Sequence, residues 1–403
     1  MEEELTLSQS VTEKNIYSRA YIEEIRERIR PIVETVVKPN AEINDKEGRF
    51  PRENLLALAK EGWNSVVLGK EYGGLDLGYV GLSIAAEELG RVDASTGLVY
   101  AMHAAATQSI ALFGTEVQKE RWLKPISEGR IGTLAISEKA SGGHVWYSFS
   151  QAERDGEDYI LNAEKSFATS GGQADFYIVQ TRTAGSSDPS EISIFIVDGH
   201  DEGITAKPWN ALGVRGNHSG PIKFENVRVN QKDLLNASTI DILNGTGVAL
   251  GLNAVWLGVA QGALDAALDH VTKTVHKDFN RNLADYQVIR QKLAELKSRI
   301  TGLRAWQIDL ARHFDELNDK NQSLLELSNE VTELKIQATE LADYAARIAM
   351  DVAGGYGYID GVFERLYRDA RGGIPMAPSN NLAREIIGRQ IVGLPLELWE
   401  EVK

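Results

Sequence analysis

The chain has 403 residues, of which 43% are apolar and 25% charged, the usual proportions of a soluble globular protein, and this length predicts two or three packed units. Lys and Arg number 43 against 58 Asp and Glu, a net charge of −15, and the absence of a basic patch argues against nucleic acid as a partner. There is no Cys, which excludes disulfides, Cys-ligated metals, iron–sulfur clusters and thiol nucleophiles, and no metal site is predicted.

The N-terminal third, residues 1–130, is predicted to be an α-helical domain. It begins with MEEELTLSQS, which lacks the basic and apolar regions of a signal peptide, so we expect a cytoplasmic protein. Between residues 17 and 38, Ile and Val recur at a three-and-four spacing, which predicts a helix with one apolar face. Helical composition continues to about residue 130, interrupted by the loop KEYGGLDLG.

The middle third, residues 131–238, is predicted to be a β-domain, and residues 239–403 a helical bundle. Short runs such as DFYIVQTRT and ISIFIVDG are rich in β-branched and aromatic residues, which is typical of strands. After residue 239, long apolar stripes return at helical spacing. The stretch 247–268 is apolar enough to raise the question of a membrane span. Asn253, Gln261 and Asp265 interrupt it, so we predict a closely packed interior helix and no membrane span.

Five segments resemble the acyl-CoA dehydrogenase family of flavoproteins, in the family's order and spacing. They are EYGG at 71–74, ALFGTEVQKERWL at 111–123, YILNAEKSFATSGG at 159–172, ALGVRGNHS at 211–219 and GGYGYIDGVFERLYRDAR at 354–371. The resemblance implies an α+β multidomain fold with an N-terminal α-helical domain, a central β-barrel-like domain and a C-terminal four-helix bundle. It also implies a homotetramer, with the flavin between the β-domain and the bundle and partly under a neighbouring subunit.

The resemblance further implies oxidation of an acyl thioester, in which a base takes the α-proton while the β-hydrogen leaves as hydride to the flavin. The family's catalytic Glu lies six residues after the Arg of RDAR, and its backbone N–H also binds the thioester oxygen. That position is Ala377, which cannot titrate, and the alternative Glu position on the first bundle helix is Val248. Either another group takes the proton, with His103 and His144 as candidates, or the reaction differs. Further candidates are His218, Glu138 and Asp369.

The resemblance also assigns cofactor-binding residues. They are Ser137, Phe167, Thr169, His276, Phe279, Gly354, Gly355 and Ser379. The isoalloxazine end matches the family, but at the pyrophosphate end His276 replaces an Arg and Asp351 replaces a Gln. FAD is therefore expected, with FMN as the alternative. The positions expected to bind CoA differ too, since Gly143 and His144 replace Ser-Asp and Ala249 replaces an Arg.

These observations predict a flavin-dependent oxidoreductase of acyl-CoA dehydrogenase type, acting on an acyl-CoA or related thioester with an atypical base and passing electrons to an acceptor. One alternative is a two-component monooxygenase that takes reduced flavin from a flavin reductase. Others are a desulfinase-like lyase and a non-catalytic flavin-binding scaffold. Loss of the usual Glu is compatible with each.

Overall fold

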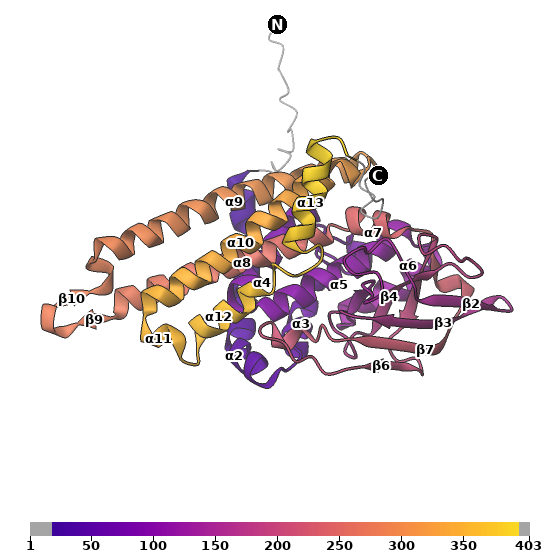
Figure 1. Cartoon of the computed structure of the whole chain (residues 1–403), viewed down its shortest axis with the longest axis horizontal. Coiled ribbons are helices and arrows are strands. Elements are labelled where there is room, and N and C mark those ends of the chain that lie inside the picture. Colours follow the sequence, from indigo (N-terminus) through magenta and orange to yellow (C-terminus); the bar gives the residue numbers. More distant parts are fainter. Residues whose placement is uncertain (1–17, 395–403) are drawn as a thin grey trace, which may run out of the picture.

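The computed structural model describes residues 18–394 of the chain. Helices from both ends of the sequence pack together, and the β-sheet region lies at one end of the molecule (Figure 1). The fold is α+β, with an N-terminal helical domain, a central β-sheet domain and a C-terminal helical domain, as predicted.

The N-terminal helices bury the predicted apolar stripe. They are α1 (Arg19–Ile32), α2 (Lys38–Glu47), α3 (Arg52–Lys60), α4 (Gly78–Val92), α5 (Ala94–Phe113) and α6 (Glu116–Trp122), with the π-helix Val33–Val37 between α1 and α2. Ile25, Ile29 and Ile32 of α1 are buried in the main core, which α4 and α8 share. Asp93 caps α5 by accepting the N–H groups of Ser95 and Thr96, so this long apolar helix has a defined start.

The central domain is a mixed sheet. Its strands are β1 (Gly132–Ala135), β2 (Gln151–Asp155), β3 (Asp158–Lys165), β4 (Phe176–Arg182), β5 (Ile192–Asp198), β6 (Ile204–Ala206), β7 (Ile222–Val229) and β8 (Leu234–Leu235). They follow the order β6-β7-β3-β2-β4-β5-β8, with β1 parallel to β4. The alternate residues of β3 and β7 that face inward are buried, as the period of two in their sequences requires.

The C-terminal domain is built from long helices that lie alongside one another and extend away from the β-sheet region (Figure 1). Its helices are α7 (Thr239–Gly245), α8 (Val248–Lys273), α9 (Gln287–Asp319), α10 (Ser328–Ala353), α11 (Gly355–Tyr358), α12 (Val362–Arg371) and α13 (Asn380–Ile391). A hairpin of β9 (Val275–His276) and β10 (Arg281–Asn282) connects α8 to α9. The hairpin and α11 lie at the end of the bundle away from the sheet (Figure 1).

Helix α8 is long and apolar enough to cross a membrane, but 78% of its most apolar window is buried inside the structure. It packs closely on α4 at two of its glycines. A Cβ on Gly258 would lie 2.2 Å from Glu87 O, and one on Gly262 would lie 2.2 Å from Arg91 O. The two backbones therefore touch, and α8 is a core helix, which confirms the prediction of a closely packed interior helix.

Candidate functional site

The loop 372–379, which joins α12 to α13, contains Ala377, the position at which the family resemblance implied a catalytic Glu. Gly373 lies directly on the bundle, because a Cβ there would be 2.9 Å from the Trp256 ring and 2.8 Å from the Thr339 methyl. The Asn380 N–H donates to Ile374 O at 3.0 Å and closes the loop. Ser379 Oγ accepts the N–H of Leu382 and caps α13. The loop is thus anchored at both ends.

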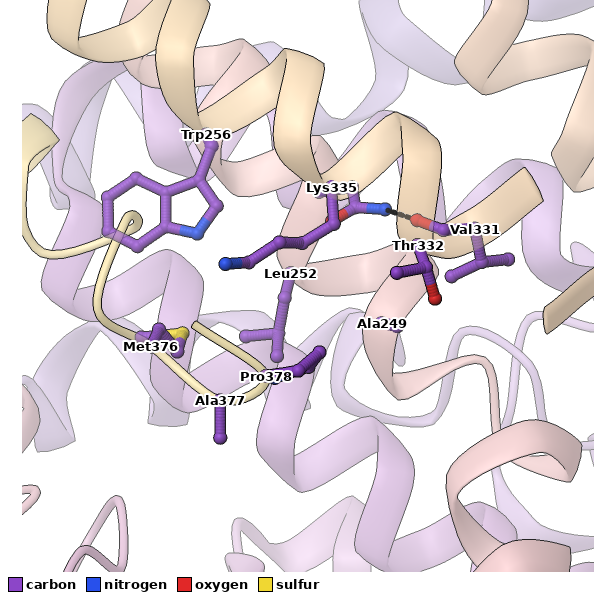
Figure 2. Close-up of a pocket in the computed structure, with 10 residues that line it drawn as sticks. Ala249, Leu252, Trp256, Val331, Thr332, Lys335, Met376, Ala377 and Pro378 are labelled. Carbon is purple, nitrogen blue, oxygen red and sulfur yellow. Dashed lines mark hydrogen bonds between the residues drawn. The ribbon is translucent and has the colours of Figure 1, made fainter. Parts of the chain in front are cut away.

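Behind this loop is a small cavity of about 30 Å³, enclosed by α8, α10 and the loop (Figure 2). It is lined by Ala249, Leu252, Asn253, Trp256, Val331, Thr332, Lys335, Met376, Ala377 and Pro378. The volume is enough for one or two water molecules. The Ala377 methyl points away from the cavity in Figure 2, and Ala377 is exposed. The loop therefore has an inner side facing the cavity and an outer side on which position 377 projects.

Lys335 of α10 is the one titratable residue that lines this cavity, and sequence reasoning missed it. Its side chain is only 6% exposed, and Nζ donates to Asn380 Oδ1 at 2.6 Å. The Asn380 amide donates in turn to Glu340 at 3.2 Å, which fixes its oxygen toward the lysine. Burial lowers the pKa of Lys335 to about 8, while Glu340 acts in the opposite direction and Arg384 adds to the lowering.

The two histidine candidates occupy different environments. His103 is fully buried, and its Nδ1 accepts the Gly132 N–H at 3.0 Å. Burial lowers the pKa of His103 to about 4, so it is neutral at pH 7. His144 is half-buried on the loop after β1, its ring centroid is 5.3 Å from that of Trp146, and burial lowers its pKa as well. Neither histidine lines the cavity behind Ala377.

The remaining proton-handling candidates are held by other groups. Glu138 accepts from Lys165 Nζ at 2.6 Å, Ser148 Oγ at 2.6 Å and the Phe149 N–H at 2.7 Å, so its buried carboxylate anchors the chain at 148–150. Asp369 is buried, and its Oδ1 accepts the Val214 N–H at 2.6 Å. His218 Nε2 lies 2.8 Å from Gly48 O. These contacts join parts of the fold, and we interpret the three residues as structural.

Three of the predicted isoalloxazine contacts lie close together. Ser137 O accepts the N–H of Ser166, which places Ser137 beside the segment that carries Phe167 and Thr169. Phe167 is 63% exposed, its ring is nearly perpendicular to that of Trp209, and Thr169 Oγ1 is 2.9 Å from Ser219 Oγ. An exposed aromatic ring beside two half-buried hydroxyl groups fits the edge and face of a flavin ring.

The other predicted flavin contacts lie elsewhere in the chain. His276 and Phe279 belong to the β9–β10 hairpin, where His276 Nδ1 is 3.1 Å from the Tyr286 hydroxyl. Gly354 and Gly355 are at α11, and a Cβ on either would meet nothing within 4 Å. The hairpin and α11 are at the opposite end of the molecule from the sheet (Figure 1). A single chain therefore does not bring all eight predicted residues together.

The β-domain meets the bundle at the loop after β1. The loop after β1 contacts the start of α13, because a Cβ on Gly143 would lie 2.8 Å from Leu382 Cδ2. His144 follows Gly143, and Leu382 lies five residues after Ala377. We take the outer side of loop 372–379, the loop of His144 and the segment of Phe167 as the candidate active site.

Comparison with known proteins gives one consistent family. Residues 21–130 match the N-terminal domain of acyl-CoA dehydrogenases, residues 133–227 the middle domain and residues 248–392 the C-terminal domain. An acyl-CoA dehydrogenase of Bacillus subtilis is 30% identical over 377 residues, covering 92% of this chain and 97% of the relative. The 3-(aryl)acrylate reductase of Clostridium sporogenes is 32% identical over 357 residues, covering 86% and 92%.

Solved structures agree with these matches. Butyryl-CoA dehydrogenase from Megasphaera elsdenii superposes with a TM-score of 0.84 at 25% identity, covering 92% of this chain and 98% of that protein. Three domain matches in order, and relatives aligned over nearly the whole length, show that this chain belongs to the acyl-CoA dehydrogenase family.

Proposed function

We propose that the protein is a flavin-dependent oxidoreductase acting on the CH–CH bond next to an acyl thioester carbonyl, with an atypical base. The observation that supports this most is the junction at which the loop of His144 contacts α13, just beyond the exposed position 377. A bound flavin, FAD by family likeness and FMN as the alternative, would supply the hydride acceptor. An electron acceptor would then reoxidise it.

The chain's own contribution begins with the thioester oxygen. Within residues 18–394 the Ala377 N–H donates to no other backbone or side-chain group, so it is free to bind an incoming oxygen. Negative charge develops on this oxygen when the α-proton leaves, and a placed N–H donor stabilises it most at that moment. The loop anchors at Gly373 and Asn380 keep this donor in place.

His144 is the candidate base best supported by the structure. His103 is fully buried against the Gly132 N–H, whereas His144 is half-buried and directly follows the residue that contacts Leu382. Burial lowers the pKa of His144 below its ordinary value, so the ring is neutral and able to accept a proton at pH 7. This assignment explains how a chain with Ala377 and Val248 can still remove an α-proton.

The test measures anaerobic flavin reduction with butyryl-, isovaleryl-, octanoyl- and 3-phenylpropionyl-CoA. We expect His144→Gln to slow reduction by about 10² to 10⁴, the usual contribution of a general base. Ala377→Glu added to the His144→Gln variant should restore part of the rate, because position 377 projects from the side of the loop away from the cavity (Figure 2), where the thioester is proposed to bind. His200→Gln, an exposed histidine of the β-domain, is the matched control and should change nothing.

The second candidate is a monooxygenase that receives reduced flavin, since His276 and Asp351 weaken the predicted pyrophosphate contacts. Flavin that stays oxidised with every acyl-CoA in wild type and in Ala377→Glu, although bound, contradicts the dehydrogenase assignment. A protein that is purified without flavin, and that takes up oxygen when it is given reduced FMN, would support the monooxygenase. Bound FAD without either reaction would leave the desulfinase-like lyase.

A further inference from the structure

The cavity behind loop 372–379 contains a buried cation that the proposed function does not use. We propose that Lys335 is a positioning residue whose positive charge strengthens the Ala377 N–H as a donor to the thioester oxygen. The inference rests on the proposed function, because it concerns the same oxygen. It assigns no proton transfer to the lysine.

Lys335 lies on the inner side of the loop, opposite the outer side on which the proposed function places the thioester. Lys335 reaches from α10 along the inner side of the loop, and the Ala377 methyl points away from the cavity on the outer side (Figure 2). Nζ donates to Asn380 Oδ1 at 2.6 Å, and Asn380 in turn closes the loop onto Ile374. Lys335 therefore acts through the loop and not by direct contact with a substrate on the outer side.

The surroundings leave the lysine's charge without a direct counterion. Glu340 is the acidic group that faces it, and this carboxylate is bound by Arg384 and by the Asn380 amide. The α8 and loop residues lining the cavity include no titratable group. Among residues 18–394 no carboxylate forms an ion pair with Lys335. The positive charge of Lys335 is therefore offset only in part, by Glu340, whose carboxylate is itself paired with Arg384.

The side chain of Asn253 leaves a hydrogen-bond acceptor in the same cavity as the lysine without a partner among the described residues. Its side chain is fully buried and lines the cavity, Nδ2 donates to Val331 O at 3.0 Å, and Oδ1 has no partner among the described residues. A cavity of about 30 Å³ has room for water that would bridge Asn253 Oδ1 and the lysine. Such water would hold the ammonium in place behind the loop.

The expected effect is on the stability of the enolate, not on the base. When the α C–H bond breaks, the proton leaves and the electron pair moves onto the thioester oxygen, which turns negative. A buried positive charge lowers the free energy of this state, because charges interact more strongly inside a protein than in water. The charge is present below the Lys335 pKa of about 8 and is lost above it.

The experiment titrates bound 3-thiabutyryl-CoA, whose α-proton is acidic and whose sulfur at position 3 prevents hydride transfer. Enolate formation at equilibrium, with solvent as the proton acceptor, is followed by the ¹³C signal of a labelled carbonyl. We expect Lys335→Met and Lys335→Gln to raise the pH midpoint by about one unit, a tenfold change in the equilibrium constant. Lys335→Arg keeps the charge and should keep the midpoint. Flavin content and melting temperature serve as the controls for folding.

The outcomes separate the inference from the function on which it rests. An unchanged midpoint in both neutral variants, with enolate formed in wild type, overturns the role of Lys335 alone. A midpoint raised as much in Lys335→Arg as in Lys335→Met shows a packing effect and also overturns it. No enolate in wild type at any pH, with the thioester bound, overturns the proposed function and this inference together.

Discussion

The carboxyl group of Asp369 is buried, and it accepts a hydrogen bond from a residue with an unusual backbone conformation. Its Oδ1 accepts the N–H of Val214, a β-branched residue at φ 47°, in the left-handed region that such residues rarely adopt. The Trp209 indole donates to Val214 O at 3.1 Å. Asp369 thus links α12, two residues before Arg371, to the loop that supports Phe167 through Trp209.

This arrangement predicts a pH-dependent stability. Burial raises the pKa of Asp369 from 3.8 to about 7, with Arg365 opposing, so the native carboxyl holds its proton over a range in which the unfolded one does not. Stability from this group is present below pH 4, falls as pH rises toward 7, and is lost above. Asp369→Asn removes the titration. Between pH 5.5 and pH 8 the free energy of unfolding of the wild type, measured with urea, should fall by about 2 kcal/mol relative to that of the variant. A difference independent of pH would contradict it.

A second prediction for a single residue concerns the hydroxyl group of Thr169. If its hydroxyl binds the isoalloxazine edge, Thr169→Val should weaken flavin binding by about 1 to 3 kcal/mol, the cost of a buried hydrogen-bonding group left without its partner. Ser219→Ala removes only the protein partner, 2.9 Å from Thr169 Oγ1, and is the matched control. Flavin dissociation constants measured by fluorescence decide the matter. Equal constants in wild type and Thr169→Val would contradict the assignment of Thr169.

The contact between α4 and α8 sets the position of the first bundle helix. Gly258→Ala would place a methyl 2.2 Å from Glu87 O, a backbone atom that cannot rotate away. The helices must then separate, and we expect a loss of about 1 to 3 kcal/mol in the free energy of unfolding. Gly302→Ala on α9 is the control, because a Cβ there meets nothing within 4 Å. It should stabilise by about 0.5 to 1 kcal/mol through helix propensity alone. Equal changes in the free energy of unfolding for Gly258→Ala and Gly302→Ala would refute the close packing of α4 on α8.

The elements were largely predictable from the sequence, because apolar spacing reports which face of a helix is buried. The stripe Leu334, Ala338, Leu341 predicted one face of α10, and those residues are buried. Lys335 follows Leu334 and belongs to the same face, yet a charged residue there gives no signal of burial. Its partner Asn380 lies 45 residues later, so the polar network exists only after the loop has packed. Spacing within one helix cannot report such a contact.

At the scale of the whole molecule, the predicted flavin contacts are divided between two ends. Phe167 and Thr169 belong to the sheet region, whereas Phe279 and Gly354 lie with the hairpin and α11 at the far end of the bundle (Figure 1). The resemblance implied a flavin partly covered by a neighbouring subunit, and this division supports that proposal. A second copy, placed so that its hairpin lies against the first copy's sheet region, would complete each site.

The exposed aromatic surface predicts where copies meet. Tyr356 is 73% and Tyr358 82% exposed, and Phe279 on the nearby hairpin is 71% exposed, far more apolar surface than an isolated helix end requires. We therefore propose a homotetramer, or at least a dimer, with these rings buried between copies. Tyr358→Asp would bury an unpaired charge at that contact and should lower both the mass measured by sedimentation velocity and the flavin content. Val117→Asp changes another strongly exposed apolar residue, on α6 and 68% exposed, and should leave both unchanged. A wild-type protein that sediments as a monomer at micromolar concentration would refute the assembly, and with it the proposal that the two halves of the flavin site come from different copies.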